Sequence, residues 1–270
     1  MIHVNTRRVC PLSLDLRQGR SRLRAGSIAT AARGDLIQRK TARRERRILR
    51  RMTPFFDSRA DAARRLAGAL ARYRGRNPLV LAIPRGAVGM GRVLADELGG
   101  ELDVVLVRKL RSPFSPEFAV GSVDETGWAY VAPHAASAGA DAEYLQSEKQ
   151  AQLEILRIRR AQYTPTRAPI EAKGRIVIVV DDGLATGATM IAALHAARAK
   201  GPERLVCAVP VAAPESLELV RPYADEMVCL DAPEPFIAVG RFYRAFPQVE
   251  DEEVVALLAQ SPKSEGGGER

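Results

Sequence analysis

The sequence predicts an α/β protein in which a parallel sheet is flanked by helices. From residue 52 to residue 260, strand-like and helix-like segments alternate along the chain, a pattern typical of a parallel sheet within one domain. Residues 176–180, IVIVV, are aliphatic without a polar break, as expected of a strand that is buried on both faces. The roughly 210 residues of this region are enough to enclose a hydrophobic core.

The first elements of this region are a helix, a strand and a second helix. Residues 57–73 have amphipathic helical spacing, and Asp57 or Ser58 is the expected N-cap. Residues 79–83, LVLAI, predict a strand, and 89–98 predict a helix that ends before two glycines.

The next segments predict a strand, a hairpin and a long helix. Residues 103–107 form a short apolar run. Residues 119–123 and 128–131 bracket the turn sequence DETG and predict a β-hairpin. Residues 142–162 are charged and helical in pattern. The remaining expected elements are the helices 188–199, 214–223 and 251–259 and the strands 204–211 and 226–230.

The segment after strand 176–180 has the composition of an anion site. Two carboxylates, Asp181 and Asp182, are followed by small and hydroxyl-bearing residues that lead into a helix. Backbone N–H groups converge at such a turn, and the helix dipole favours negative charge. The paired carboxylates can accept hydrogen bonds from the vicinal hydroxyls of a sugar. A phosphate and a diol together describe a ribose 5-phosphate. The alternative is a buried strand followed by an ordinary capped helix.

Residues 177–189 resemble the phosphoribosyl pyrophosphate (PRPP) signature of type I phosphoribosyltransferases. The resemblance implies that fold, with a small hood and a mobile β-hairpin loop. It also implies that Asp181 and Asp182 hold the ribose hydroxyls. The 5-phosphate would be held by Ala185, Thr186, Gly187, Ala188 and Thr189. The segment is neither a Walker loop nor a GxGxxG turn.

The same resemblance makes residues 84–87, PRGA, the pyrophosphate loop, where the backbone of Arg85 and Gly86 would bind the diphosphate. Related enzymes often hold a non-proline cis peptide in this loop, and Arg85–Gly86 is the candidate bond. An ordinary strand-to-helix turn at Gly86 is the alternative.

Arg108 and Lys109 directly follow the predicted strand 103–107. They are either solvated cations or catalytic groups that stabilise the charge developing on a pyrophosphate leaving group. Adenine and orotate phosphoribosyltransferases have a similar Val-Arg-Lys, and residues 110–117 would then begin the mobile loop that excludes water.

The acceptor-binding residues give mixed signals. Ala185 stands where hypoxanthine-guanine enzymes have an Asp, which argues against 6-oxopurine salvage. Glu125 either takes the role of the mobile-loop glutamate of adenine enzymes or is a plain turn residue. Phe236, in a segment similar to the hypoxanthine-guanine hood, either stacks on an acceptor ring or packs in the core. The whole of residues 55–255 most resembles the stand-alone "predicted phosphoribosyltransferase" group.

The resemblance implies a transferase of nucleotide metabolism that uses PRPP and Mg²⁺, transfers the phosphoribosyl group to a nitrogen acceptor and releases pyrophosphate. Mg²⁺ would be held mainly by substrate oxygens, and we expect no dedicated protein metal site. A PRPP-sensing regulator and a phosphoribosyl-handling hydrolase are the competing hypotheses. We expect a cytoplasmic protein, because the three cysteines lack metal-type spacing and suit a reducing compartment. No stretch reaches the length of a membrane span. The resemblance further implies a homodimer.

The net charge of +9 belongs to the N-terminal extension. Residues 1–51 hold fifteen Arg and Lys against three acids, so the rest of the chain is mildly acidic. We expect residues 1–51 and the end, 261–270, to be disordered. The extension binds nucleic acid, is a transit peptide, has no consequence, or results from a mis-assigned start, with Met52 the true one; we favour the last two.

A chain that begins at Met52 is therefore expected to fold and bind PRPP like the full chain. Thermal melting and calorimetry check this. Loss of the cooperative melt on truncation would show that residues 1–51 are structural.

Overall fold

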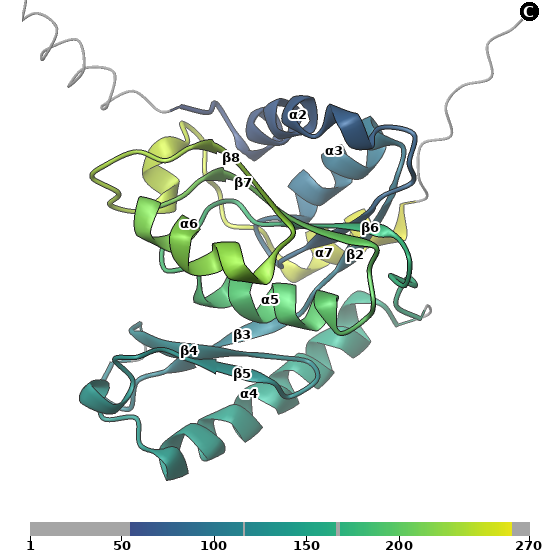
Figure 1. Ribbon diagram of the computed structural model, residues 1–270. Helices are drawn as coiled ribbons and strands as arrows, with labels where there is room; N and C mark the ends of the chain where they lie inside the picture. The colour runs from purple at the N-terminus through teal and green to yellow at the C-terminus, as the bar shows by residue number, and fades with distance from the viewer. Residues whose placement is uncertain (1–54, 116, 166–167, 261–270) are drawn as a thin grey trace, which may run out of the picture. The chain divides into compact units, whose positions relative to one another are not determined.

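The computed structural model describes residues 55–115, 117–165 and 168–260 (Figure 1). The predictions made for residues 1–51 and 261–270 lie outside the described residues.

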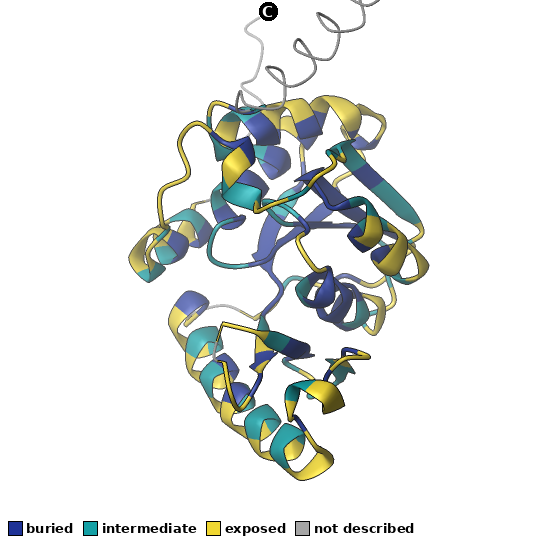
Figure 2. Cartoon of the chain, turned by 90° about the vertical axis from the view of Figure 1, so that its left-hand side faces the viewer, coloured by how far each residue is buried: buried dark blue, intermediate teal, exposed yellow. Residues whose placement is uncertain are grey.

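A five-stranded parallel sheet forms the centre of the domain, in the order β2-β1-β6-β7-β8. The predicted parallel α/β fold is confirmed. The central strand β6 (Ile176–Val180) is buried along its whole length, and the interior of the sheet is dark blue in Figure 2. The other strands are β1 (Leu79–Ala82), β2 (Glu101–Val104), β7 (Arg204–Val211) and β8 (Glu226–Asp231).

Helices cover both faces of this sheet because alternate aliphatic residues of each strand point to opposite faces. Val80 and Ile178 pack in one cluster with residues of α2 (Arg59–Ala69), α3 (Val88–Leu98) and α7 (Asp251–Ala259). Leu79 and Val177 pack in a second cluster with α5 (Ala188–Arg198) and the end of α6 (Pro214–Val220).

A second, antiparallel sheet lies beside the first and carries α4 (Ala142–Tyr163) (Figure 1). Its strands are β3 (Val107–Arg111), β4 (Ala119–Asp124) and β5 (Ala129–Val131). The hairpin and the long helix were therefore predicted correctly. The predicted strand 103–107 was partly wrong.

The chain leaves the central sheet after Val104 and enters the second sheet at Val107. Arg108 and Lys109 consequently lie within an antiparallel strand, and Lys109 pairs in register with Ser122. The reason is tertiary, since β4 offers hydrogen bonds that the apolar pattern of residues 103–107 does not reveal.

Most other boundaries agree with the sequence to within a few residues. Ser58, not Asp57, caps α2, because its side chain accepts a hydrogen bond from the backbone N–H of Asp61. Both α2 and α6 end before the predicted positions, and each continues as a short 3-10 turn, Ala71–Tyr73 and Arg221–Tyr223 respectively. Among the described helices, none is both long and apolar enough to cross a membrane.

The close packing of α3 on the sheet yields a stability prediction. A Cβ at Gly91 would lie 2.7 Å from Leu102 Cδ1 and 2.9 Å from Ala82 Cβ. Gly91→Ala should therefore lower the free energy of unfolding by about 1–3 kcal/mol through overpacking, measured by urea denaturation.

Gly68→Ala is the matched control, because Gly68 lies in α2 with no atom within 4 Å of an added Cβ. It should raise stability by about 0.5–1 kcal/mol through helix propensity alone. If both substitutions stabilise, α3 is not closely packed against β1 and β2.

Candidate active site

Residues 181–187, the loop predicted as an anion site and here called the phosphate-type loop, connect the central strand β6 to α5, as the sequence predicted. Gly187 adopts φ 77° at the N-cap of α5, and a Cβ there would meet Val220 Cγ2 at 2.8 Å, so glycine is required. A cavity of about 200 Å³ lies over the loop. Its lining combines all residues from Asp181 to Gly187 with Thr189, Met190, Lys109 and Val239.

Asp181 and Asp182 lie side by side in this cavity. The backbone N–H of Asp182 donates to Asp181 Oδ1 at 2.8 Å. Burial, and next the charge of Asp182, raise the pKa of Asp181 well above its usual range, while Lys109 partly opposes this. Burial also raises the pKa of Asp182, against the opposing charge and hydrogen bond of Arg59.

Arg59, the first residue of α2, is a site residue that the sequence did not reveal. Its Nε and Nη2 both lie 2.9 Å from Asp182 Oδ2. The guanidinium is held in turn by the ring of Phe246, 3.6 Å from its centroid, and by the carbonyl of Pro247 at 2.6 Å. Arg59 thus favours the ionised form of Asp182 and fixes its orientation, which leaves Oδ1 of this carboxylate for another partner.

The predicted cis bond was placed one residue too late. The structure has a cis peptide at Pro84–Arg85, not at Arg85–Gly86. The prediction missed by one residue because residue types alone do not indicate which peptide bond of the turn is cis. The Arg85 side chain points to the residue that precedes α7, where Nη1 lies 3.2 Å from Glu250 Oε2. At Gly86 a Cβ would lie only 2.5 Å from Asp182 Oδ2, so the loop approaches the carboxylate pair closely.

A second cavity, of about 300 Å³, adjoins the first and is strongly basic. Lys109 and Thr189 line both cavities, so the two cavities are adjacent. The charged residues that line the second cavity are Arg108, Lys109, Arg111 and Arg159 with the single acid Glu117, and Pro84 of the cis peptide borders it.

The basic cavity places positive charges in mutual repulsion. Burial, and next the charges of Arg159 and Arg111, lower the pKa of Arg108. Arg108 Nε donates to Gln152 Oε1 of α4 at 2.9 Å, which holds the side chain in place. An anion in this cavity would relieve the repulsion. The contribution of Arg159 was missed because α4 looks like a plain charged helix in the sequence.

A buried hydrogen bond ties the second sheet to the phosphate-type loop. Ser122 Oγ of β4 donates to the carbonyl of Ala188 at 2.7 Å. Because Lys109 pairs with Ser122 in register, this contact fixes the lysine relative to the start of α5.

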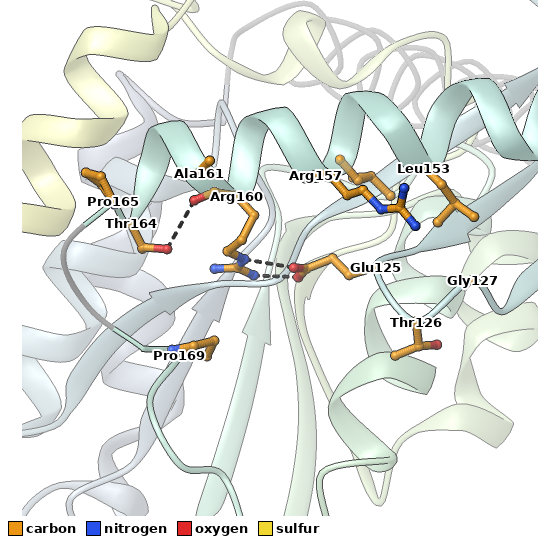
Figure 3. Close-up of a pocket in the computed structure, with 11 residues that line it drawn as sticks. Glu125, Thr126, Gly127, Leu153, Arg157, Arg160, Ala161, Thr164, Pro165 and Pro169 are labelled. Carbon is orange, nitrogen blue, oxygen red and sulfur yellow. Dashed lines mark hydrogen bonds and ion pairs between the residues drawn. The ribbon is translucent and has the colours of Figure 1, made fainter.

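Two predicted acceptor residues do not line these cavities. Glu125 lies in the turn after β4 and pairs with Arg160 of α4, whose Nε donates to Glu125 Oε1 at 2.7 Å (Figure 3). Phe236 is half-buried, and its ring packs on Phe242 with centroids 5.1 Å apart. Val239, three residues later, is the hood residue that reaches the carboxylate cavity.

The loop residues have separate surroundings. Ala185 and Thr186 are exposed, and the Ala185 carbonyl accepts a hydrogen bond from Ser216 Oγ at 2.8 Å. Within the described residues, no three His, Cys, Asp or Glu side chains cluster as a metal centre. The two adjacent carboxylates do fit a magnesium ion that takes one or two protein carboxylates and its remaining ligands from substrate and water.

The fold and the site together define a class of protein: a parallel α/β sheet with an anion-type loop at the end of its central strand. Comparison with known proteins identifies this class. Residues 56–244 match the family model described as the phosphoribosyl transferase domain. The chain therefore belongs to the phosphoribosyl transferase family.

Known relatives agree with this assignment. The chain is 42% identical over 204 residues to a protein of Mycobacterium tuberculosis H37Rv named "Putative phosphoribosyl transferase Rv0571c". The match covers 75% of this chain and 46% of that protein, so the chain spans about half the length of the curated relatives it matches. The crystal structure of the protein TT1426 from Thermus thermophilus is 47% identical, covers 75% of this chain and 97% of that one, and has a TM-score of 0.64.

The raised pKa of Asp181 predicts an unusual pH dependence. In the unfolded chain the carboxyl titrates near 3.8, so between 3.8 and the raised folded pKa the folded chain binds more protons. Unfolding free energy should therefore fall as pH rises through this window. Asp181→Asn should stabilise the fold at pH 7, and the gain should vanish once the pH falls to the unfolded pKa and below, as checked by urea denaturation across pH.

Asp225→Asn is the control of opposite sign. The hydrogen bond from Arg198, foremost, lowers the pKa of Asp225, so removing its charge should destabilise the fold at pH 7. A destabilised Asp181→Asn variant at pH 7 would contradict the assigned pKa direction.

Proposed function

We propose that the chain transfers the 5-phosphoribosyl group of PRPP to a nitrogen acceptor and releases pyrophosphate. The observation that carries the proposal is that the two cavities are adjacent and share Lys109 and Thr189 in their linings. PRPP has a phosphate and a diol at one end of the ribose and a diphosphate at C1. A carboxylate-bearing cavity joined to a basic cavity is complementary to both ends of such a molecule.

Each part of the site has a proposed role. Asp181 and Asp182 accept hydrogen bonds from the ribose hydroxyls, and Arg59 favours the ionised form of Asp182. Residues 185–189 bind the 5-phosphate through backbone N–H groups and the hydroxyls of Thr186 and Thr189. The backbone of the Arg85–Gly86 segment and the basic side chains of the second cavity bind the diphosphate.

Catalysis in this proposal is electrostatic. Lys109, Arg108 and Arg159 stabilise the negative charge that develops on pyrophosphate as the C1–O bond breaks. A bound Mg²⁺ would supply further charge neutralisation on the diphosphate, and the carboxylates of Asp181 and Asp182 are the residues that would hold it. No covalent nucleophile is required, because positioning of the acceptor nitrogen at C1 suffices.

The acceptor side of the site is apolar. Val239 borders the ribose cavity, and a Cβ at Gly183 would meet its Cγ1 at 2.8 Å. Ala185 offers no carboxylate to an acceptor. We therefore propose a ring nitrogen of a nucleobase-like acceptor, positioned by packing rather than by an acidic group beside it.

The test is incubation of the chain with PRPP and Mg²⁺ and a panel of bases, with pyrophosphate release as the readout. Release that depends on one acceptor supports the transferase. Release without any acceptor indicates a hydrolase, and tight PRPP binding without release indicates a sensor.

Lys109→Ala should separate catalysis from binding. A cation needed mainly in the transition state affects turnover more than ground-state affinity. We expect kcat to fall about 100-fold or more, with the PRPP dissociation constant within about threefold of the parent. Steady-state kinetics and calorimetry measure the two effects. Lys173→Ala, at an exposed position before β6, is the control and should change neither.

Thr186→Ala should show the opposite behaviour. Loss of one hydroxyl hydrogen bond to a charged phosphate costs about 1.5–3 kcal/mol, so PRPP affinity should fall roughly 10–100-fold while kcat changes less.

If Lys109→Ala leaves turnover within about twofold of the parent, the basic cavity is not the leaving-group site.

A further inference from the structure

A third cavity, of about 570 Å³, lies between the turn after β4 and the second half of α4 (Figure 3). It shares no lining residue with the carboxylate cavity or the basic cavity. Its volume is that of a site for a small organic molecule. The proposed reaction makes no use of it.

The lining indicates the chemistry of an occupant. Leu153 and Leu156 supply an apolar wall from α4. Arg157 and Arg160 are cationic, and Glu125 is the only carboxylate of the lining, so the cavity has an excess of positive charge. An anionic group on an apolar body is complementary to these residues. Figure 3 shows Leu153, Arg157 and Arg160 along the helix, with Glu125 facing Arg160.

Both arginines already have carboxylate partners, so an incoming anion would compete with these carboxylates. The Arg157 side chain is 78% exposed, and its 3.3 Å contact with Glu154 is also exposed, so this guanidinium can turn to an incoming anion at little cost. Arg160 is already committed to Glu125 through Nε and Nη2. The remaining nitrogen, Nη1, is buried 3.9 Å from Asp103 Oδ1, so an anion that binds Arg160 must displace part of the pair with Glu125.

The Glu125–Arg160 pair holds together the segment that leads to Lys109. Glu125 Oε2 accepts the backbone N–H of Leu106 at 3.2 Å, and Arg160 Nη2 donates to the carbonyl of Val104 at 3.2 Å. These are the two ends of the connection between β2 and β3. In addition, Arg159, the neighbour of Arg160 on α4, lines the basic cavity.

We propose that this third cavity is a regulatory site for a small amphipathic anion, whose binding loosens the Glu125–Arg160 pair and weakens PRPP binding. Occupation releases the N–H of Leu106 and lets β3 move relative to the end of β2, which displaces Arg108 and Arg111 of the basic cavity together with Lys109. The binding half of the proposal stands by itself, whereas the coupling half rests on the proposed function.

Anilinonaphthalene sulfonate is a suitable probe, because it joins an aromatic body to one anionic group and fluoresces in apolar surroundings. Titration of the full chain without PRPP should show one saturable site. Arg157→Glu and Leu153→Asp should each weaken it at least about tenfold. Arg157 is exposed, so its substitution keeps the fold even if Leu153→Asp does not.

Ile158→Glu is the matched control, because Ile158 is 60% exposed on the same helix and does not line the cavity. The affinity of the Ile158→Glu variant for the probe should stay within about twofold of the parent. Fluorescence that survives Arg157→Glu unchanged would come from exposed apolar residues elsewhere, such as Phe114 or Ile237, and would overturn the site. Absence of saturable binding would do the same.

The coupling is read by PRPP calorimetry with and without saturating probe. The PRPP dissociation constant should rise at least about fivefold, and PRPP should weaken probe binding by the same factor. Glu125→Gln, which weakens the pair without probe, should raise the PRPP dissociation constant in the same direction. An unchanged PRPP affinity would overturn the coupling while leaving the site. Failure of the parent chain to bind PRPP at all would instead count against the proposed function.

Discussion

The carboxylate pair at the end of β6 is the constraint around which the other parts of the site are arranged. Burial raises the pKa of both carboxyls, and the charge of Asp182 further opposes the ionisation of Asp181. The fold compensates from several directions, with Arg59 on Asp182 and Lys109 near Asp181. A glycine at position 86 leaves room for this arrangement. The charges of Arg59 and Lys109 thus favour the ionised forms of these acids, which accept hydrogen bonds.

This arrangement joins distant parts of the chain. Arg59 belongs to the first described helix, whereas Phe246 and Pro247, which hold its guanidinium, lie near the last. Tyr243 adds a hydrogen bond from its hydroxyl to the carbonyl of Asp182 at 2.7 Å. The two ends of the domain are therefore connected through the site itself, so local unfolding of either end would also release the orientation of Asp182.

The parts predicted from sequence are those determined by local chemistry. β6, its two acids and the glycine-containing turn are contiguous, so their pattern is readable without the fold. The contribution of Arg59 could not be predicted from the sequence, because Arg59 is one of many arginines and its partner, Asp182, lies 123 residues away along the chain. The antiparallel strand that carries Lys109 was missed for a similar reason, since its hydrogen-bonding partners come from β4. The sequence left Glu125 as either a mobile-loop glutamate or a plain turn residue, and in the fold its carboxylate is engaged by Arg160.

The hydrogen bond between Ser122 and the Ala188 carbonyl also indicates which segments around Lys109 can vary in sequence and length. Lys109 and Ser122 are paired across the sheet, so the position of the lysine depends on β3, β4 and α5. It does not depend on the connection from Ser112 to Phe118, where Phe114 is 83% exposed. Related chains can therefore lengthen, shorten or recompose that connection while the lysine stays in place.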